Sequence, residues 1–226
     1  MVFFELMNMK TDKLTNSINK IKDSLEEEDE QREKVIKLQR NCIRTCGEAI
    51  KSVHREEFDV ADEKIKTAKN LKNEMLAKVK GQEGLECWGG LLSAYQELAE
   101  AIITNAIIRH DEIPAVEECD VPHASYLLGL GDAIGELRRY LMNSLKERDF
   151  DNARRAFEYM EFIYSELMSI DYPKMLVGPL RSKVDFARSL VNKTRSDLIN
   201  ALQANELEQS MKNLSKKLDR LNEPES

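Results

Sequence analysis

The chain has 226 residues, of which 42% are hydrophobic, 33% charged and 6% aromatic, and its formal net charge is −7. This is ample apolar material for a core, and the negative balance excludes an overall basic field, so binding to nucleic acid would need a local basic patch. Only nine glycines and five prolines occur, and strand-like alternation is absent, which predicts an all-α fold. We expect one helical domain over residues 1–226, with flexible ends at 1–10 and 223–226.

The cysteines and the apolar stretches indicate in which cellular compartment to expect the protein. Cys42, Cys46, Cys87 and Cys119 are too few and too scattered for a disulfide framework. Cys42 and Cys46 lie four residues apart without further ligands at zinc spacing, which predicts buried thiols. The start, MVFFELMNMK, does not resemble a signal peptide, and no stretch is long and apolar enough to span a bilayer. We expect a cytoplasmic protein with no membrane partner.

Seven helices are predicted from apolar residues that recur at spacings of three and four. The first three extend over residues 11–55, 59–80 and 85–109, and the third is apolar around its circumference, which is typical of a helix buried on most sides. After a loop with two prolines, a fourth helix ends near residue 145, a fifth begins at RDFDN (148–152) and a sixth begins near residue 180. The seventh carries a heptad-like series, which would pack on the sixth helix or meet neighbouring subunits. The series consists of Leu207, Met211, Leu214, Leu218 and Leu221.

The first helix has a basic side. At about 100° per residue, a group of bases lies nearly opposite its apolar residues, namely Lys37, Arg40, Arg44, Lys51 and Arg55. A basic helix face can follow the phosphates of a nucleic acid, so the last four of these residues are candidates for contacting an RNA backbone. The alternative is an ordinary solvated face, and Glu48, within the stripe, weakens the functional interpretation.

The segment LLGLGDAIGELRRY (127–140), in the fourth helix, contains Gly129, Gly131 and Gly135. A dinucleotide-binding loop would need a preceding strand and the spacing G-x-G-x-x-G, whereas here helix and loop precede and the spacing is G-x-G-x-x-x-G. Each glycine in a helix costs about 1 kcal/mol relative to alanine, and the close approach of another backbone would explain that cost. The glycines therefore predict a tight helix crossing.

Two acidic pairs lie on helices that are otherwise apolar enough to be buried. Glu97 and Glu100 are three apart on the third helix. Asp132 and Glu136 are four apart on the fourth, so each pair projects from one face. Buried carboxylates are paired with cations, protonated or bound to metal. Four convergent carboxylates would suit Mg²⁺ or Mn²⁺, whereas the absence of Glu-x-x-His pairs argues against a di-iron site. The alternative is salt bridges to nearby bases, such as Arg138 and Arg139.

Three segments resemble the translin family. YLLGLGDAIGELRRYLMNSL (126–145) is similar to the family signature Y-L-x-G-x-x-D-x-x-G-E-L-x-R. GPLRSKVDFARSLVNKTRSDL (178–198) is similar to the family's late helix, with its L-R-x-K-x-D start. YQELAEAI (95–102) resembles the Q-E-x-x-E-A element of translin-associated factor X. The resemblance covers about residues 85–202 and implies the seven-helix bundle of the translin type.

The resemblance also implies a function. Translin-associated factor X has a Mg²⁺-dependent endoribonuclease site of four carboxylates, and the matching positions here are Glu97, Glu100, Asp132 and Glu136. The basic, histidine-rich segment of translin is absent, since the corresponding stretch is GQEGLECWGG (81–90), in which Trp88 alone is kept. The chain therefore resembles the catalytic member more than the binding one. Its short length resembles a prokaryotic, archaeal member.

These observations predict a Mg²⁺- or Mn²⁺-dependent endoribonuclease that cleaves single-stranded RNA or unpaired RNA segments, with Glu100 or Glu136 as general base. The resemblance implies a closed homo-oligomer, an octamer, with sites that face its interior. The alternatives are a non-catalytic scaffold that binds RNA or single-stranded DNA, as translin does, and a helical protein-interaction module. Metal-dependent cleavage separates the enzyme from the scaffold, and RNA retention at low salt separates the scaffold from the module.

Overall fold

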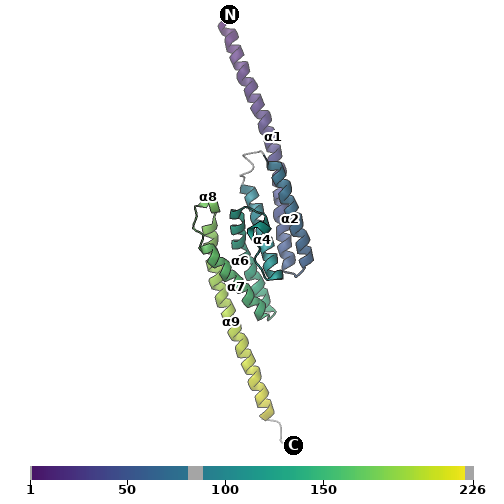
Figure 1. Cartoon of the computed structure of the whole chain (residues 1–226), viewed down its shortest axis with the longest axis vertical. Coiled ribbons are helices and arrows are strands. Elements are labelled where there is room, and N and C mark those ends of the chain that lie inside the picture. Colours follow the sequence, from purple (N-terminus) through teal and green to yellow (C-terminus); the bar gives the residue numbers. More distant parts are fainter. Residues whose placement is uncertain (1, 81–88, 222–226) are drawn as a thin grey trace.

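The computed structural model describes residues 2–80 and 89–221, and the regular elements within these ranges are all helices (Figure 1). Two single-turn helices lie in the predicted loops, α5 (Val116–Cys119) and α8 (Lys174–Val177). The all-α prediction is confirmed. The long helices are α1 (Val2–Val53), α2 (Phe58–Val79), α4 (Gly89–His110), α6 (His123–Lys146), α7 (Phe150–Met168) and α9 (Leu180–Leu221).

The predicted sixth and seventh helices are one continuous helix, α9, of 42 residues. Neither glycine nor proline occurs between residues 180 and 221, so nothing in the backbone ends the helix. The heptad-like series is therefore the second half of α9 and cannot fold back on a sixth helix. At the other end, α1 already begins at Val2, whereas residues 223–226 lie outside the described part of the chain.

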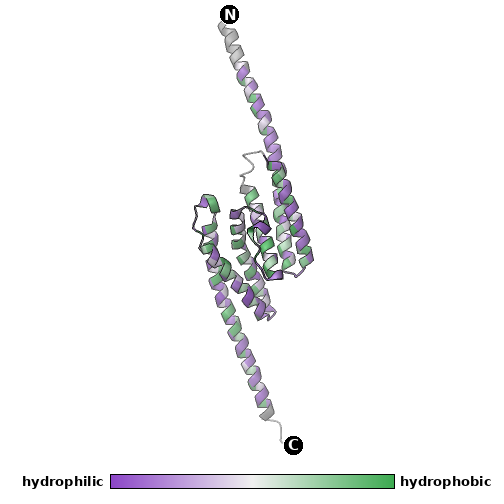
Figure 2. Ribbon diagram, viewed as in Figure 1, coloured by the Kyte–Doolittle hydropathy of each residue, from purple (hydrophilic) through white to green (hydrophobic). Residues whose placement is uncertain are grey.

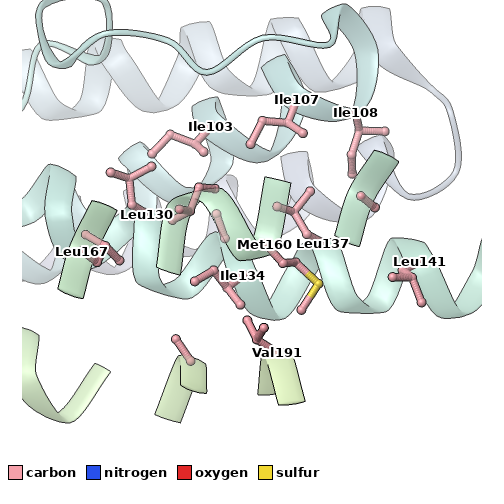
Figure 3. Packing of buried hydrophobic residues seen from close by; sticks show 14 of the residues in the cluster. Ile103, Ile107, Ile108, Leu130, Ile134, Leu137, Leu141, Met160, Leu167 and Val191 are labelled. Atoms are coloured by element: carbon pink, nitrogen blue, oxygen red, sulfur yellow. The ribbon is translucent and has the colours of Figure 1, made fainter. Parts of the chain in front are cut away.

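Two hydrophobic clusters meet at α4. One joins α4 to α1 and α2 through residues such as Leu98 and Met75. The other joins α4 to α6, α7 and α9, and Figure 3 shows isoleucines of α4 on one side of α6 and Val191 of α9 on the other. Because α4 contributes to both clusters, it is buried on most sides, as its all-round apolar sequence predicts.

Three of the cysteines are part of this hydrophobic core. Cys42, Cys46 and Cys119 are free thiols in the core, as predicted, and Cys42 Sγ lies 3.6 Å from the Ala68 carbonyl oxygen. Cys87 and Trp88 lie outside the described residues. In the ranges 2–80 and 89–221, none of the helices has the length and apolar character needed to cross a bilayer.

The beginning of α1 and the end of α9 project from the bundle in opposite directions (Figure 1). We call residues 11–30 the N-terminal arm and residues 203–219 the C-terminal arm. The described side chains of the N-terminal arm are all exposed. Those of the C-terminal arm are exposed except Asn205 and Glu208, which are half-buried. The Leu207 series therefore does not pack on the bundle of its own chain.

Candidate active site

The site forms where α6 crosses α4, and Gly129 permits the crossing. A Cβ atom at this position would lie 2.7 Å from Ala99 Cβ and 3.0 Å from the backbone of Gln96 and Glu100. Real side chains do not tolerate such contacts, so the helices approach this closely only because the residue is glycine. Asp132 follows three residues later on the same face, and the crossing therefore brings it to the acidic pair of α4. The predicted tight crossing is present at this residue.

The other two glycines of the segment differ from each other. A Cβ at Gly131 would lie 3.3 Å from Lys183 Cβ, so this glycine gives room for the close approach of α9. A Cβ at Gly135 would meet nothing within 4 Å, and no close approach explains this residue. The crossing interpretation thus holds for Gly129 and Gly131 but not for Gly135.

The structure brings the four predicted carboxylates together. Burial raises the pKa of Glu97, and the negative charge of Asp132 raises it further. The effect is larger at Glu100, where burial and then the charges of three acids raise the pKa to about 8. Those three acids are Glu97, Asp132 and Glu136. Each carboxylate of the cluster is therefore near enough to disfavour ionisation of Glu100.

Positive groups compensate the two carboxylates of α6. Asp132 accepts a hydrogen bond from Gln96 Nε2 at 2.5 Å and forms an ion pair with Lys183 of α9. Glu136 accepts a hydrogen bond at 2.5 Å from Nε2 of His54, which lies in the turn directly after α1, and this bond lowers the pKa of Glu136. His54 Nδ1 is buried without a partner in the described part of the chain.

The acidic pair of α4 lacks such compensation. Among the residues that the structure describes, neither Glu97 nor Glu100 has a hydrogen-bond or ion-pair partner. The positive charge of Lys183 lowers the pKa of Glu100, but burial and the charges of the three acids outweigh this effect. The site therefore keeps an excess of negative charge on one side, beside α4.

The salt-bridge interpretation is realised in part, through bases that the sequence did not single out. Arg138 points elsewhere and binds Asp197 at 2.7 Å, and Arg139 reaches Glu136 only at 3.5 Å. Lys183 lies in the L-R-x-K-x-D segment, so the family motif contained a signal for it. His54 carries no motif, and only the fold reveals it, because the turn after α1 brings its side chain to Glu136 of α6.

The donor chemistry of the cluster fits a hard divalent cation. The four side chains offer only carboxylate oxygens, which suit Mg²⁺ or Mn²⁺, and the uncompensated charge at Glu97 and Glu100 favours a cation there. In residues 2–80 and 89–221, no three His, Cys, Asp or Glu side chains already have positions that could hold a metal ion. Lys183 provides the positive charge in this structure, and His54 provides a hydrogen bond.

The basic stripe of α1 faces solvent. Arg40, Arg44 and Lys51 are exposed along α1, and Arg55, which the sequence placed on the same helix, is exposed in the turn that follows it. Glu48, the acid within the stripe, binds Lys64 of α2 at 2.6 Å, so a base from outside the stripe balances its charge. The stripe is therefore accessible to an anionic partner, and the turn at its end supplies His54 to the carboxylate cluster.

Fold and site together define a helical bundle with a carboxylate cluster at a glycine-mediated helix crossing. The model of the Translin family matches residues 4–223, and this chain belongs to that family. The protein MJ0175 of Methanocaldococcus jannaschii, which has no assigned function, is 32% identical over 202 residues, 87% of this chain and 88% of that protein.

Solved structures share the fold. AfC3PO in complex with duplex RNA is 33% identical, with a TM-score of 0.73, and a crystal structure of AfC3PO is 34% identical, with a TM-score of 0.74. Each match covers 83% of this chain and 97% of the AfC3PO chain. Apo-NeC3PO, at 23% identity over 81% of this chain and 96% of its own, has the same fold with a TM-score of 0.73.

Proposed function

We propose that this chain is a metal-dependent endoribonuclease that acts on RNA within a homo-oligomer. The observation that carries the proposal is the pair Glu97 and Glu100, half-buried acids that have no ion-pair partner among the described residues and whose ionisation Asp132 and Glu136 disfavour. Burying charge without a partner is costly, and such an arrangement is typical of functional sites. Membership of the translin family and similarity to a protein solved with duplex RNA support an RNA-related function.

In this proposal the four carboxylates hold Mg²⁺ or Mn²⁺. When bound, the ion stabilises negative charge at the scissile phosphate and helps to deprotonate the attacking water. Lys183 orients Asp132 through their ion pair, and His54 orients Glu136 through their hydrogen bond. Glu100, with a pKa of about 8 before an ion binds, can hold or release a proton near neutral pH.

RNA would be held through its backbone. Arg40, Arg44, Lys51 and Arg55 present positive charge along one helix, and phosphates are the part of RNA that such a stripe recognises. The sequence predicts single-stranded RNA as the substrate, whereas the AfC3PO complex contains duplex RNA. Both forms therefore belong in the test.

A non-catalytic RNA-binding scaffold is the second candidate. The observation that favours it is the neutralisation of two carboxylates by the chain's own bases, in the pairs Lys183–Asp132 and His54–Glu136. If these pairs persist in solution in the presence of Mg²⁺, the cluster is a structural polar network rather than a metal site.

Incubation of the purified chain with end-labelled RNA separates the candidates. One RNA is single-stranded and the other is its duplex, and each is incubated with Mg²⁺, with Mn²⁺ or with EDTA. The nuclease predicts cleavage with either metal and none with EDTA. Intact RNA that is retained by the protein in all three conditions would favour the scaffold, and cleavage that continues in EDTA would exclude the proposed metal dependence.

A further inference from the structure

The two arms carry apolar faces of the same spacing. In both arms, four apolar residues follow one another at steps of four, three and four, and each of these residues is between 43% and 64% exposed. Figure 2 shows both arms as mostly hydrophilic helices with hydrophobic positions at intervals. In the N-terminal arm they are Leu14, Ile18, Ile21 and Leu25, and in the C-terminal arm they are Leu207, Met211, Leu214 and Leu218.

Helical segments of this kind need a partner. Isolated helices of about 12–15 residues are only marginally stable in water. The apolar residues of both arms are exposed, although Glu208 of the C-terminal arm forms an ion pair with Arg148 of the bundle at 2.9 Å. Steps of four and three are the a and d positions of a heptad repeat, which form the seam of a coiled coil. Each arm thus carries the apolar a and d residues that one helix contributes to such a seam.

We propose that the N-terminal arm of one copy packs in parallel on the C-terminal arm of a second copy, as a short two-stranded coiled coil. The proposal rests on the homo-oligomer in the proposed function but not on nuclease activity. In this register Leu14 faces Leu207 and Ile18 faces Met211. The next two layers join Ile21 to Leu214 and Leu25 to Leu218.

The charges of the arms select the partner and the direction. In the N-terminal arm, Lys13, Lys20 and Lys22 precede a block of six acids at residues 23–30 that contains no base. The C-terminal arm has the opposite order, because Glu206 and Glu208 precede three lysines at residues 212–217 that contain no acid. In the parallel register, Lys217 and Asp29 occupy flanking g and e positions, where their opposite charges attract, while Glu26 lies level with Asp219 away from the seam.

The other pairings fit less well. Antiparallel pairing of the two arms places Lys20 near Lys212 and Glu26 near Glu206, which are like charges. Pairing of two N-terminal arms would leave the acidic block without the three lysines of the C-terminal arm. The largest acidic block and the densest basic block lie on different arms, so a contact between different arms satisfies both.

The shape of the molecule permits this contact. α1 and α9 run in the same direction along the long axis, and their arms extend from opposite ends (Figure 1). A second copy stacked head to tail along this axis presents its C-terminal arm parallel to the N-terminal arm of the first. Such a contact uses two different surfaces, and it closes when the rotation between copies completes a ring.

Disulfide cross-linking between two variants, each with one added cysteine beside the buried Cys42, Cys46 and Cys119, tests the register. Ile18→Cys and Met211→Cys are prepared separately in a Cys87→Ser background, mixed and oxidised, and circular dichroism verifies the fold of each. We expect a cross-linked pair as the main product of the mixture. Ile18→Cys mixed with Leu214→Cys, the pair that an antiparallel register would join, is the matched control. The proposal is overturned if this control or either variant alone cross-links more strongly, or if nothing cross-links.

A charge exchange tests the partner without cysteines. Lys217→Glu should raise the concentration at which the assembly dissociates by about two- to fivefold, the range of exposed ion pairs, and Asp29→Lys in the same chain should restore it. Asp23→Lys, on the outer side of the coil, should not restore it, and equal rescue by both would contradict the assigned register.

The cross-linking and cleavage experiments test the two proposals separately. If cross-linking fails while metal-dependent cleavage persists, only the arm pairing is contradicted. If cleavage proves independent of metal while cross-linking succeeds, only the proposed metal-dependent nuclease activity is contradicted.

Discussion

Glu100 experiences the strongest electrostatic conflict of the four acids. It is half-buried, three other carboxylates disfavour its ionisation, and it has no ion-pair partner among the described residues. Asp132 and Glu136 escape this conflict because Lys183 and His54 reach them from other helices. Among the described residues, the two acids of α6 thus have partners and the two acids of α4 have none. This difference distinguishes the cluster from a fully compensated salt-bridge network.

This conflict predicts a pH-dependent stability without metal. The folded-state pKa of Glu100 is about 8 and its ordinary value is 4.5. Between these values the folded chain binds more protons than the unfolded chain, so this acid lowers stability as the pH rises toward 8 and above. Glu100→Gln removes this destabilisation. The Tm of the variant in EDTA should therefore exceed that of the wild-type chain by more at about pH 9 than at about pH 5.

Glu158→Gln, on the exposed face of α7, is the control for that measurement. It should leave the difference in Tm independent of pH. At this chain length a change of 1 kcal/mol moves the Tm by about 2–4 °C, so the effect is measurable by a thermal scan. A constant difference between Glu100→Gln and wild type at both pH values would show that the carboxylate is not electrostatically strained.

For individual residues, the sequence predicts the four acids of the cluster but not the side chains that bind them. Spacings of three and four place each pair on one helix face, and the family motif indicates that the two faces meet. His54 and Gln96 are ordinary residues in the sequence, and their roles arise only when α1 and α6 pack against α4. Such contacts depend on tertiary packing, which helical periodicity does not determine.

Among the elements, α6 depends on its glycines in two ways. Gly129→Ala places a methyl group 2.7 Å from Ala99 Cβ, so α6 must move away from α4. We expect destabilisation of about 1–3 kcal/mol from this overpacking. Gly135→Ala meets nothing within 4 Å and should stabilise the helix by up to about 1 kcal/mol. Urea unfolding of the two variants should therefore give changes of opposite sign, and equal changes would refute the crossing as the reason for Gly129.

The basic stripe of α1 is testable through salt dependence. Arg40→Glu combined with Arg44→Glu should weaken binding of single-stranded RNA, and the log–log salt slope should fall by roughly 0.7 for each phosphate that the protein no longer neutralises. Arg154→Glu combined with Lys193→Glu changes the net charge equally on α7 and α9, away from the stripe. If this control lowers the slope as much as the α1 variant does, the stripe has no specific role.

The elements show where periodicity is sufficient and where it fails. The body helices were predictable because each has a buried face, and their bounds agree within a few residues except at the start of α1, which was predicted at residue 11 and lies at Val2. The division of α9 into two helices was wrong because its second half has an apolar series that no described part of the same chain covers. Such a series indicates a partner as readily as it indicates a separate helix, and the sequence alone does not distinguish the two.

The whole molecule is an elongated bundle with two uncovered arms, and its assembly follows from them (Figure 1). The purified chain should elute from size exclusion at several times 26.0 kDa, and a closed assembly should keep that size as the concentration rises. Light scattering checks the mass independently of shape. A monomer across micromolar concentrations would contradict the homo-oligomer, whereas growth without limit would indicate an open filament instead of a shell.

The central claim is that the carboxylate cluster performs metal-dependent cleavage of RNA, and the comparison of Glu100→Gln with wild type tests it most directly. Both are given the same labelled RNA with saturating Mg²⁺, and cleavage and RNA retention are measured on the same samples. We expect the variant to retain RNA as wild type does but to cleave it at least about 100-fold more slowly, as for removal of a catalytic acid or base, while Glu158→Gln cleaves normally. Cleavage by Glu100→Gln at the wild-type rate, or no cleavage by wild type with any divalent metal, would contradict the claim.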